Sequence, residues 1–208
     1  KVGGPGEFET VIINELLPHV EATYGAATGR EHRTIAGLSM GGHGALRLAY
    51  AHPHLFRATA SMSGAIWQNV PDEDLDLPPD ELLFLAQNDY FHFVAKETVL
   101  PGIDLPPPGE HFSGAFGEPF DARFFNSVSV FSELQRLLDA EQELPATYLA
   151  VGDGDSHELW RGAIALFTTL RGHDKPATLR VTGGSHTWSV WREAIGPALV
   201  FLDNTRRP

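Results

Sequence analysis

The sequence contains no cysteine, so disulfides, thiolate nucleophiles and cysteine-ligated metal sites are excluded. Positive charge is also scarce, because 15 Lys and Arg residues stand against 27 Asp and Glu residues and the net charge is −12. Such a chain offers no basic surface to phosphate backbones or anionic lipids, and we expect neither a nucleic-acid nor a membrane partner. Its apolar runs fall short of the roughly 18 residues that span a membrane, and it opens with no signal-like segment. We expect a water-soluble protein, and secreted, periplasmic and cytoplasmic locations all stay open.

The composition that remains predicts a single globular domain over residues 1–208, since 42% hydrophobic residues suffice for a sizeable core. Apolar residues at helical spacing predict a helix over residues 8–24, with a kink at Pro18. Four short extended runs follow, at residues 33–36, 58–62, 146–151 and 178–182. Each is followed by a glycine-containing turn and a helix. This alternation predicts a parallel sheet in an α/β fold.

Two of the later helices carry apolar stripes that we expect to pack on the sheet faces. The stripe after Asp155 comprises Leu159, Ala163, Phe167 and Leu170, and the stripe of the last helix comprises Trp191, Ile195, Leu199 and Leu202.

Residues 66–132 interrupt the alternation with an acidic, proline-rich stretch that also holds aromatic side chains. Loops of this length are usually functional or disordered, and the aromatic and leucine content argues against full disorder. We interpret the stretch as an insertion over the functional site. Its aromatic residues either contact an apolar group of a substrate or form a small core of their own.

The motif at residues 37–41, Gly-Leu-Ser-Met-Gly, fits the pattern G-x-S-x-G. In that pattern a strained turn between a strand and a helix exposes the serine, and small residues two positions away avoid a clash. The pattern alone is weak evidence, but here an extended run ends at Ala36 and a helical run begins after Gly41. We therefore predict Ser39 as a nucleophile, with the N–H of Met40 as a donor to the oxyanion.

A serine hydroxyl needs a base, so a histidine must lie on a loop that reaches Ser39. His186 lies between the last predicted strand and the last helix, at the sheet edge where catalytic loops gather. The other histidines considered either lie at helix ends or point away from the turn: His52, His54, His173 and His43. His186 is the predicted base.

Two aspartates after the third strand, Asp153 and Asp155, could orient this histidine. Asp155 could instead be a helix N-cap, because an acidic residue follows three positions later. Asp153 stays the alternative acid. The pair does not form a calcium loop, since position 12 from Asp153 is Ile164 and not Glu. The order Ser39, Asp155, His186 is the order typical of α/β-hydrolases.

The chain resembles the esterase D, feruloyl esterase and acetyl xylan esterase group of α/β-hydrolases, which has antigen 85 mycolyltransferases and enterochelin esterases as more distant relatives. The resemblance rests on residues 15–20, 37–49 and 52–56, on the acid loop 151–155 and on the histidine loop 183–191. The Gly-x-x-Asp pattern of the group's acid loop favours Asp155. The resemblance implies an α/β-hydrolase fold, mainly a parallel sheet with helices on both faces.

The same group has further strands before the first helix, and a loop among them supplies a second oxyanion N–H. This chain has no counterpart of them, and it starts without an initiator Met. We expect the N-terminal strands to be missing and an upstream polypeptide segment, or a paired chain, to complete the site.

The residues together predict a carboxylic ester hydrolase that works through an acyl-serine intermediate, with no metal or organic cofactor implied. The alternatives are an acyltransferase of antigen 85 type that uses an alcohol acceptor, and a non-catalytic binding protein with a hydrolase fold. The expected substrate is a small-molecule or glycan-linked ester, and Leu38, Trp67 and Trp188 are the residues predicted to contact it.

Overall fold

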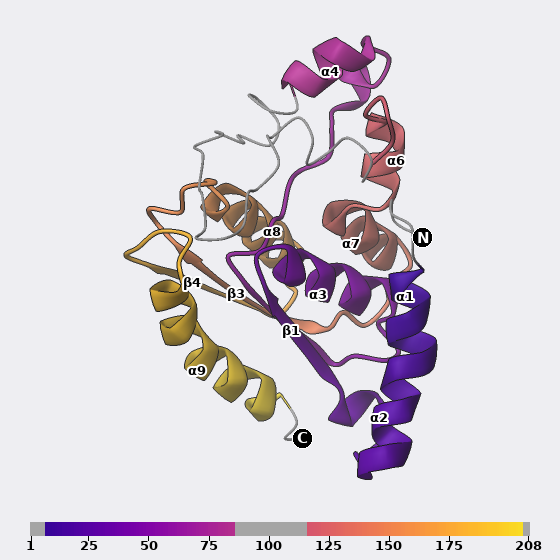
Figure 1. The fold of residues 1–208 in the computed structure, drawn as a ribbon, viewed down its shortest axis with the longest axis vertical. Coiled ribbons are helices and arrows are strands. Elements are labelled where there is room, and N and C mark those ends of the chain that lie inside the picture. Colours follow the sequence, from indigo (N-terminus) through magenta and orange to yellow (C-terminus); the bar gives the residue numbers. More distant parts are fainter. Residues whose placement is uncertain (1–6, 86–115, 206–208) are drawn as a thin grey trace, which may run out of the picture.

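The computed structural model describes residues 7–85 and 116–205, and its centre is one parallel sheet in the order β1-β2-β3-β4 (Figure 1). The strands are β1 (Thr34–Leu38), β2 (Ala58–Met62), β3 (Ala146–Gly152) and β4 (Ala177–Thr182). Each pairs with its neighbour without a register break, for example Thr34 with Ala58 and Thr147 with Ala177. All four predicted strands are confirmed, with ends that differ by at most two residues.

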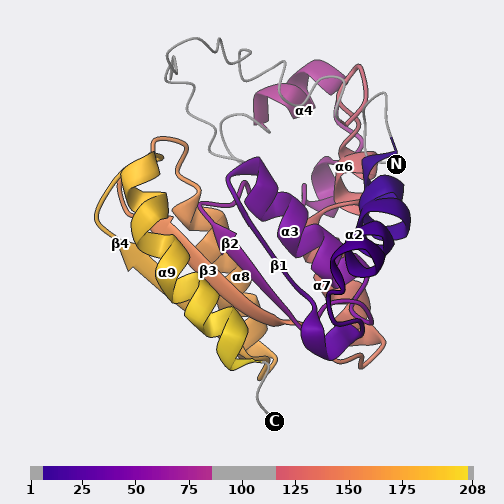
Figure 2. The same cartoon turned by 60° about the horizontal axis from the view of Figure 1, so that its bottom comes forward.

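Helices cover both faces of the sheet, as Figures 1 and 2 show. The helical elements after β1 are α3 (Met40–Ala51), η3 (Asp72–Asp74), α4 (Pro79–Leu85), α6 (Ala122–Ser127), α7 (Val130–Asp139), α8 (Trp160–Gly172) and α9 (Trp188–Asn204). Side chains of α3, α7 and α8 share one core cluster with Leu149 of β3. Tyr148 and Ala150, which point the other way, pack with α9. Within the described part of the chain, no helix is long and apolar enough to cross a membrane.

The N-terminal helix runs through α1 (Phe8–Thr10), the π-helical η1 (Val11–Leu16) and α2 (Leu17–Tyr24). Pro18 lies just after the π-helical turns, and its ring nitrogen has no N–H for the helical ladder. Glu9 joins this helix to α3 by pairing with Arg47 at 2.6 Å and with His52 at 2.8 Å, and Ile13 packs against the core cluster to which α3 contributes. The predicted apolar face is not buried against the described residues, and Phe8 is exposed.

The apolar stripe predicted for the last helix is confirmed at Trp191 and Leu202, which belong to or pack against one core cluster, and is wrong at Ile195 and Leu199. Ile195 and Leu199 are 39% and 56% exposed, whereas Ala198 and Leu202 are buried. The helix lies over Ala58 and Ala60 of β2, where side chains on the sheet are short, and an alanine is the residue that fits there. In α8 the predicted stripe is confirmed: Leu159, Ala163 and Leu170 are buried and Phe167 is partly buried.

β1 is an outer strand of the sheet, and in residues 7–85 and 116–205 its only strand partner is β2. Its five residues are not fully buried, whereas all five of β2 are. The N-terminal helix and α9 also carry exposed apolar side chains, namely Phe8, Val11, Leu16, Ile195, Leu199 and Val200. Figure 2 shows β1 between α9 and the N-terminal helix.

The described parts of the predicted insertion contribute to a core. Phe116, Phe120 and Phe125 form a cluster with Trp67, and this cluster also contains Val151 of β3 and Leu159, the N-cap of α8. Residues 86–115 of the insertion lie outside the described residues. The described aromatic residues of this cluster therefore pack in a core of the protein.

Gly162 of α8 sets how closely that helix approaches the chain after β2. A Cβ atom there would lie 1.8 Å from the carbonyl oxygen of Ile66, which is backbone and has little freedom to move. We expect Gly162→Ala to lower the free energy of unfolding by about 1 to 3 kcal/mol, as overpacking does. Gly172 in the same helix is the matched control, because a Cβ there meets no described atom within 4 Å. Denaturant unfolding of both variants checks this, and equal stabilities would contradict it.

Candidate active site

Ser39 lies on a strained turn between β1 and α3, with φ 52° and ψ −124°. The backbone holds it there, because its N–H donates to Met62 O at 2.9 Å and its carbonyl accepts from the N–H of Ala65 at 3.1 Å. A positive φ costs free energy for a residue with a Cβ, so surrounding structure must impose it. The predicted sharp turn from strand to helix is present at the predicted residue.

Two glycines make this turn sterically possible. A Cβ at Gly37 would lie 2.1 Å from Gly41 O, and a Cβ at Gly42 would lie 2.9 Å from the Cα of Gly64. A Cβ at Gly41 would meet no described atom within 4 Å. The crowded positions are therefore 37 and 42, and not 37 and 41 as the motif predicts.

His186 contacts Ser39 from a loop 147 residues further along the chain. Its Nε2 lies 3.0 Å from Ser39 Oγ, and its Nδ1 lies 2.8 Å from Oδ2 of Asp155. A carboxylate accepts hydrogen bonds, so we assign the imidazole proton to Nδ1. Nε2 is then free to accept the proton of the Ser39 hydroxyl, which is the arrangement a serine nucleophile needs.

Asp155 is 3% exposed and follows β3. Burial by itself raises the pKa of Asp155, but hydrogen bonds and charge from His186 and the backbone N–H of His157 outweigh burial, and the pKa is lowered. The N–H of His157 donates to Oδ1 at 2.9 Å. Asp155 is therefore ionised at neutral pH, as a residue that stabilises an imidazolium must be.

The alternative roles for the acid loop were a helix cap at Asp155 and a contact between Asp153 and His186. The structure contains neither of them. Helix α8 begins at Trp160, and its N-cap is Leu159, so Asp155 does not cap it. Asp153 does not meet His186. Its Oδ1 accepts from the N–H of Gly184 at 3.0 Å and so joins the acid loop to the histidine loop.

The imidazole of His186 lies in a row of aromatic rings that contact one another edge to face. The ring centroid of His157 lies 5.0 Å from that of His186, and the ring centroid of Trp191 lies 4.9 Å from it, both at an interplanar angle of 87°. Trp188 continues the row at 5.1 Å from Trp191. No spacing in the sequence predicts this contact between His157 and His186.

The residues predicted to contact a substrate lie in different environments. Trp188, the first residue of α9, is 62% exposed. Leu38 is partly buried at the end of β1, and Trp67 is 8% exposed inside the core cluster of the insertion. Met40 is the first residue of α3, and the first N–H groups of a helix have no partner within it.

His43 binds the loop that follows β2. Its Nδ1 donates to Ala65 O at 3.0 Å, and Ala65 also binds the backbone of Ser39. Burial, opposed by this hydrogen bond and assisted by the charge of Arg47, lowers the pKa of His43 to about 4. It is a neutral structural group at neutral pH.

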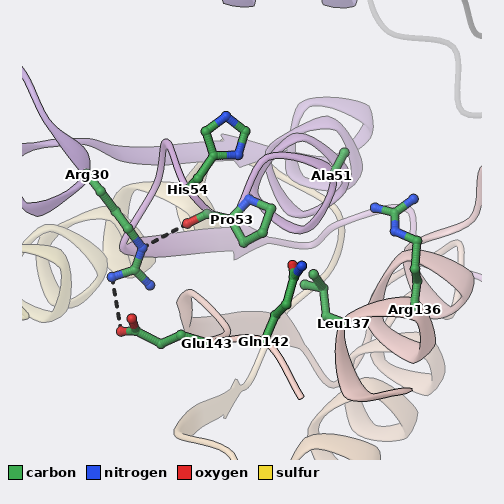
Figure 3. A pocket seen from close by; sticks show the side chains of 8 residues that line it. All are labelled: Arg30, Ala51, Pro53, His54, Arg136, Leu137, Gln142 and Glu143. Carbon is green, nitrogen blue, oxygen red and sulfur yellow. Dashed lines mark hydrogen bonds and ion pairs between the residues drawn. The ribbon is translucent and has the colours of Figure 1, made fainter. Parts of the chain in front are cut away.

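Figure 3 shows a pocket of about 590 Å³ that is lined in part by Ala51, the last residue of α3, whereas Ser39 precedes the first residue of that helix. Its lining includes Arg30, whose Nε donates to Pro53 O at 2.8 Å and whose Nη1 pairs with Glu143 at 3.0 Å. The 12 residues of α3 separate the pocket from Ser39 by about 18 Å. It is not part of the cluster around His186.

A parallel sheet with a serine on a strained turn after a strand, and an acid and a histidine on later loops, defines the α/β-hydrolase class. A model of the family described as putative esterase matches residues 1–202. The chain belongs to this esterase family.

Curated relatives match part of the chain. Esterase Rv1288 of Mycobacterium tuberculosis (strain ATCC 25618 / H37Rv) is 35% identical over 137 residues, which are 61% of this chain and 30% of that protein. An endo-1,4-beta-xylanase/feruloyl esterase of Xylanibacter ruminicola is 30% identical over 83 residues, which are 40% of this chain and 11% of that protein. The chain thus spans less than a third of the length of these relatives.

Solved structures confirm the fold. A ferulic acid esterase superposes with a TM-score of 0.64 at 23% identity, covering 100% of this chain and 64% of that one. MPT51 of Mycobacterium tuberculosis gives 0.63 at 18% identity, with 96% and 68% covered. Enterochelin esterase from Shigella flexneri gives 0.55 at 18% identity, with 97% and 38% covered. The predicted α/β-hydrolase fold and the resemblance to this esterase group are both confirmed.

The two aspartates of the acid loop have different hydrogen-bond partners, and the same substitution at each position distinguishes their roles. Asp155→Asn should lower kcat for a p-nitrophenyl ester by about 10⁴-fold, because an amide no longer fixes the tautomer of His186. Asp153→Asn is the matched control, since the Asn carbonyl still accepts from the N–H of Gly184, and its kcat should stay close to that of the unmodified protein. A larger loss at Asp153 than at Asp155 would transfer the acid role to Asp153.

Proposed function

We propose that this chain hydrolyses carboxylic esters through an acyl-serine intermediate, with Ser39 as nucleophile, His186 as base and Asp155 as the orienting acid. One observation carries the proposal: a continuous line of hydrogen bonds, of 3.0 and 2.8 Å, joins Ser39 Oγ to His186 and His186 to a buried carboxylate. Membership of the esterase family supports the reaction type.

In the proposed reaction, Ser39 Oγ attacks the ester carbonyl carbon while His186 Nε2 takes the hydroxyl proton. The tetrahedral intermediate collapses, the bond to the alcohol oxygen breaks, and His186 returns the proton to the leaving alcohol. Water then repeats the steps on the acyl-serine and releases the carboxylic acid. The ionised Asp155 stabilises the imidazolium that forms in both halves.

The N–H of Met40 supports the oxyanion in this proposal. It lies at the N-terminus of α3, where the helix dipole favours negative charge. Removal of one donor from an oxyanion hole typically costs about 10²- to 10³-fold in rate. Full activity therefore requires a second donor besides Met40.

An acyltransferase would use the same acyl-serine and differ in the acceptor, and product analysis with an alcohol present separates the two reactions. A purely binding role is disfavoured because the three side chains are in reacting geometry. For the substrate we propose a small-molecule or glycan-linked ester. The exposed indole of Trp188, close to His186 through Trp191, supports contact with a flat or apolar group.

Ser39→Ala should lower kcat by about 10⁶-fold, because the three residues of such a triad act as a unit. A fluorophosphonate should label Ser39 in the unmodified protein, and peptide mapping by mass spectrometry locates the label. Ser189, a serine of the exposed start of α9, is the control, and Ser189→Ala should keep both activity and labelling. Labelling at another residue in an active preparation would remove Ser39 as the nucleophile.

We further propose that polypeptide other than these 208 residues, an upstream segment or a paired chain, covers the open edge of β1 and supplies the second oxyanion donor. The open edge of β1 and the exposed apolar side chains of the N-terminal helix and α9 support this.

The molar mass of the active species, measured by light scattering after size exclusion, should therefore exceed 22.7 kDa. A fully active, monomeric species of 22.7 kDa would contradict this proposal while leaving the chemistry of Ser39 intact.

A further inference from the structure

His157 contacts both Asp155 and His186, through different parts of the residue. Its backbone N–H donates to Asp155 Oδ1 at 2.9 Å, and its ring lies 5.0 Å from the ring of His186. The first contact belongs to the backbone and does not depend on the side chain. The second depends on the imidazole alone.

The hydrogen bond from Nδ1 to Asp155 fixes one point of the His186 ring but leaves it free to pivot about that bond. A pivot moves Nε2, which must stay within reach of Ser39 Oγ at 3.0 Å. Rings packed edge to face at about 5 Å restrict such a pivot, because movement in either direction brings atoms into contact. Trp191 restricts it on one side, at 4.9 Å and 87°.

His157 supplies a second ring contact of the same kind, since its centroid lies 5.0 Å from that of His186 at an interplanar angle of 87°. It is partly buried, and it comes from the acid loop, whereas Trp191 comes from α9. The two contacts therefore join the histidine to two separate elements of the fold.

We infer that the imidazole of His157 is a positioning residue that keeps Nε2 of His186 aligned with Ser39 Oγ by ring packing. The inference rests on the proposed function, because it concerns the base of that reaction. It assigns His157 no proton transfer and no contact with substrate.

Three substitutions separate ring packing from other roles of this side chain. His157→Phe keeps a ring, His157→Gln keeps polar atoms without a ring, and His157→Ala removes both. All three keep the backbone N–H, so the hydrogen bond to Asp155 is preserved in each. His173→Ala, at the exposed C-terminal end of α8, is the control for loss of a histidine away from the site.

We expect His157→Ala and His157→Gln to lower kcat for a p-nitrophenyl ester by about 3- to 10-fold with little change in KM, as loss of an edge-to-face pair would. His157→Phe and His173→Ala should stay within about twofold of the unmodified protein. The pH profile of kcat should keep its midpoint in His157→Phe. An effect equal in Phe and Ala, or none in Ala, would overturn the inference.

A second readout does not need turnover. The proton on His186 Nδ1, bonded to Asp155, should give a downfield resonance in the proton NMR spectrum, assigned by its loss in Asp155→Asn. The resonance should exchange faster with water in His157→Ala and stay as in the unmodified protein in His157→Phe. Unchanged exchange in His157→Ala would reject the positioning role. If the unmodified protein neither cleaves esters nor labels at Ser39, the proposed function fails. The comparison of proton exchange rates between His157→Ala and His157→Phe still tests the inference in that case.

Discussion

The turn at Ser39 is the constraint to which the rest of the site is fitted. A residue with a Cβ is held at φ 52° there, and the strain persists because β1, β2 and α3 fix the backbone on both sides of it. Gly37 and Gly42 allow this approach, since a side chain at either position would collide with backbone. The strained turn points the serine hydroxyl at the sheet edge where the later loops arrive.

Two of those loops are connected to each other before they meet the serine. Asp153 and Gly154 bind the backbone of Gly184, and Gly152 leaves no room for a Cβ against the carbonyl of that same glycine. These contacts tie the acid loop to the histidine loop. This explains why the 2.8 Å contact between Asp155 and His186 can be maintained across 31 residues of sequence. Asp153, the alternative acid of the sequence analysis, has a supporting role in this arrangement.

The sequence was sufficient for the parts of the structure that depend on local pattern. The four strands, the turn at Ser39 and the order of the three polar residues follow from periodicity and motif. The buried face of α9 does not follow from this pattern. Ile195 and Leu199 are apolar yet exposed, because the short side chains of β2 favour Ala198 at the interface. The contact of His157 with His186 was equally hidden, since ring packing between distant loops leaves no spacing in the sequence. The open edge of β1 follows from strand order, which the family resemblance supplied and the topology shows.

The central claim is that Ser39 carries the acyl group during turnover. The most direct measurement mixes the protein with an excess of p-nitrophenyl acetate, quenches with acid during the first turnovers, and maps the acetylated peptide by mass spectrometry. We expect an acetyl group on Ser39 that accumulates in step with a burst of p-nitrophenol and is absent in Ser39→Ala. Steady hydrolysis with acetyl transfer to a different residue, or with the same burst in Ser39→Ala, would contradict it.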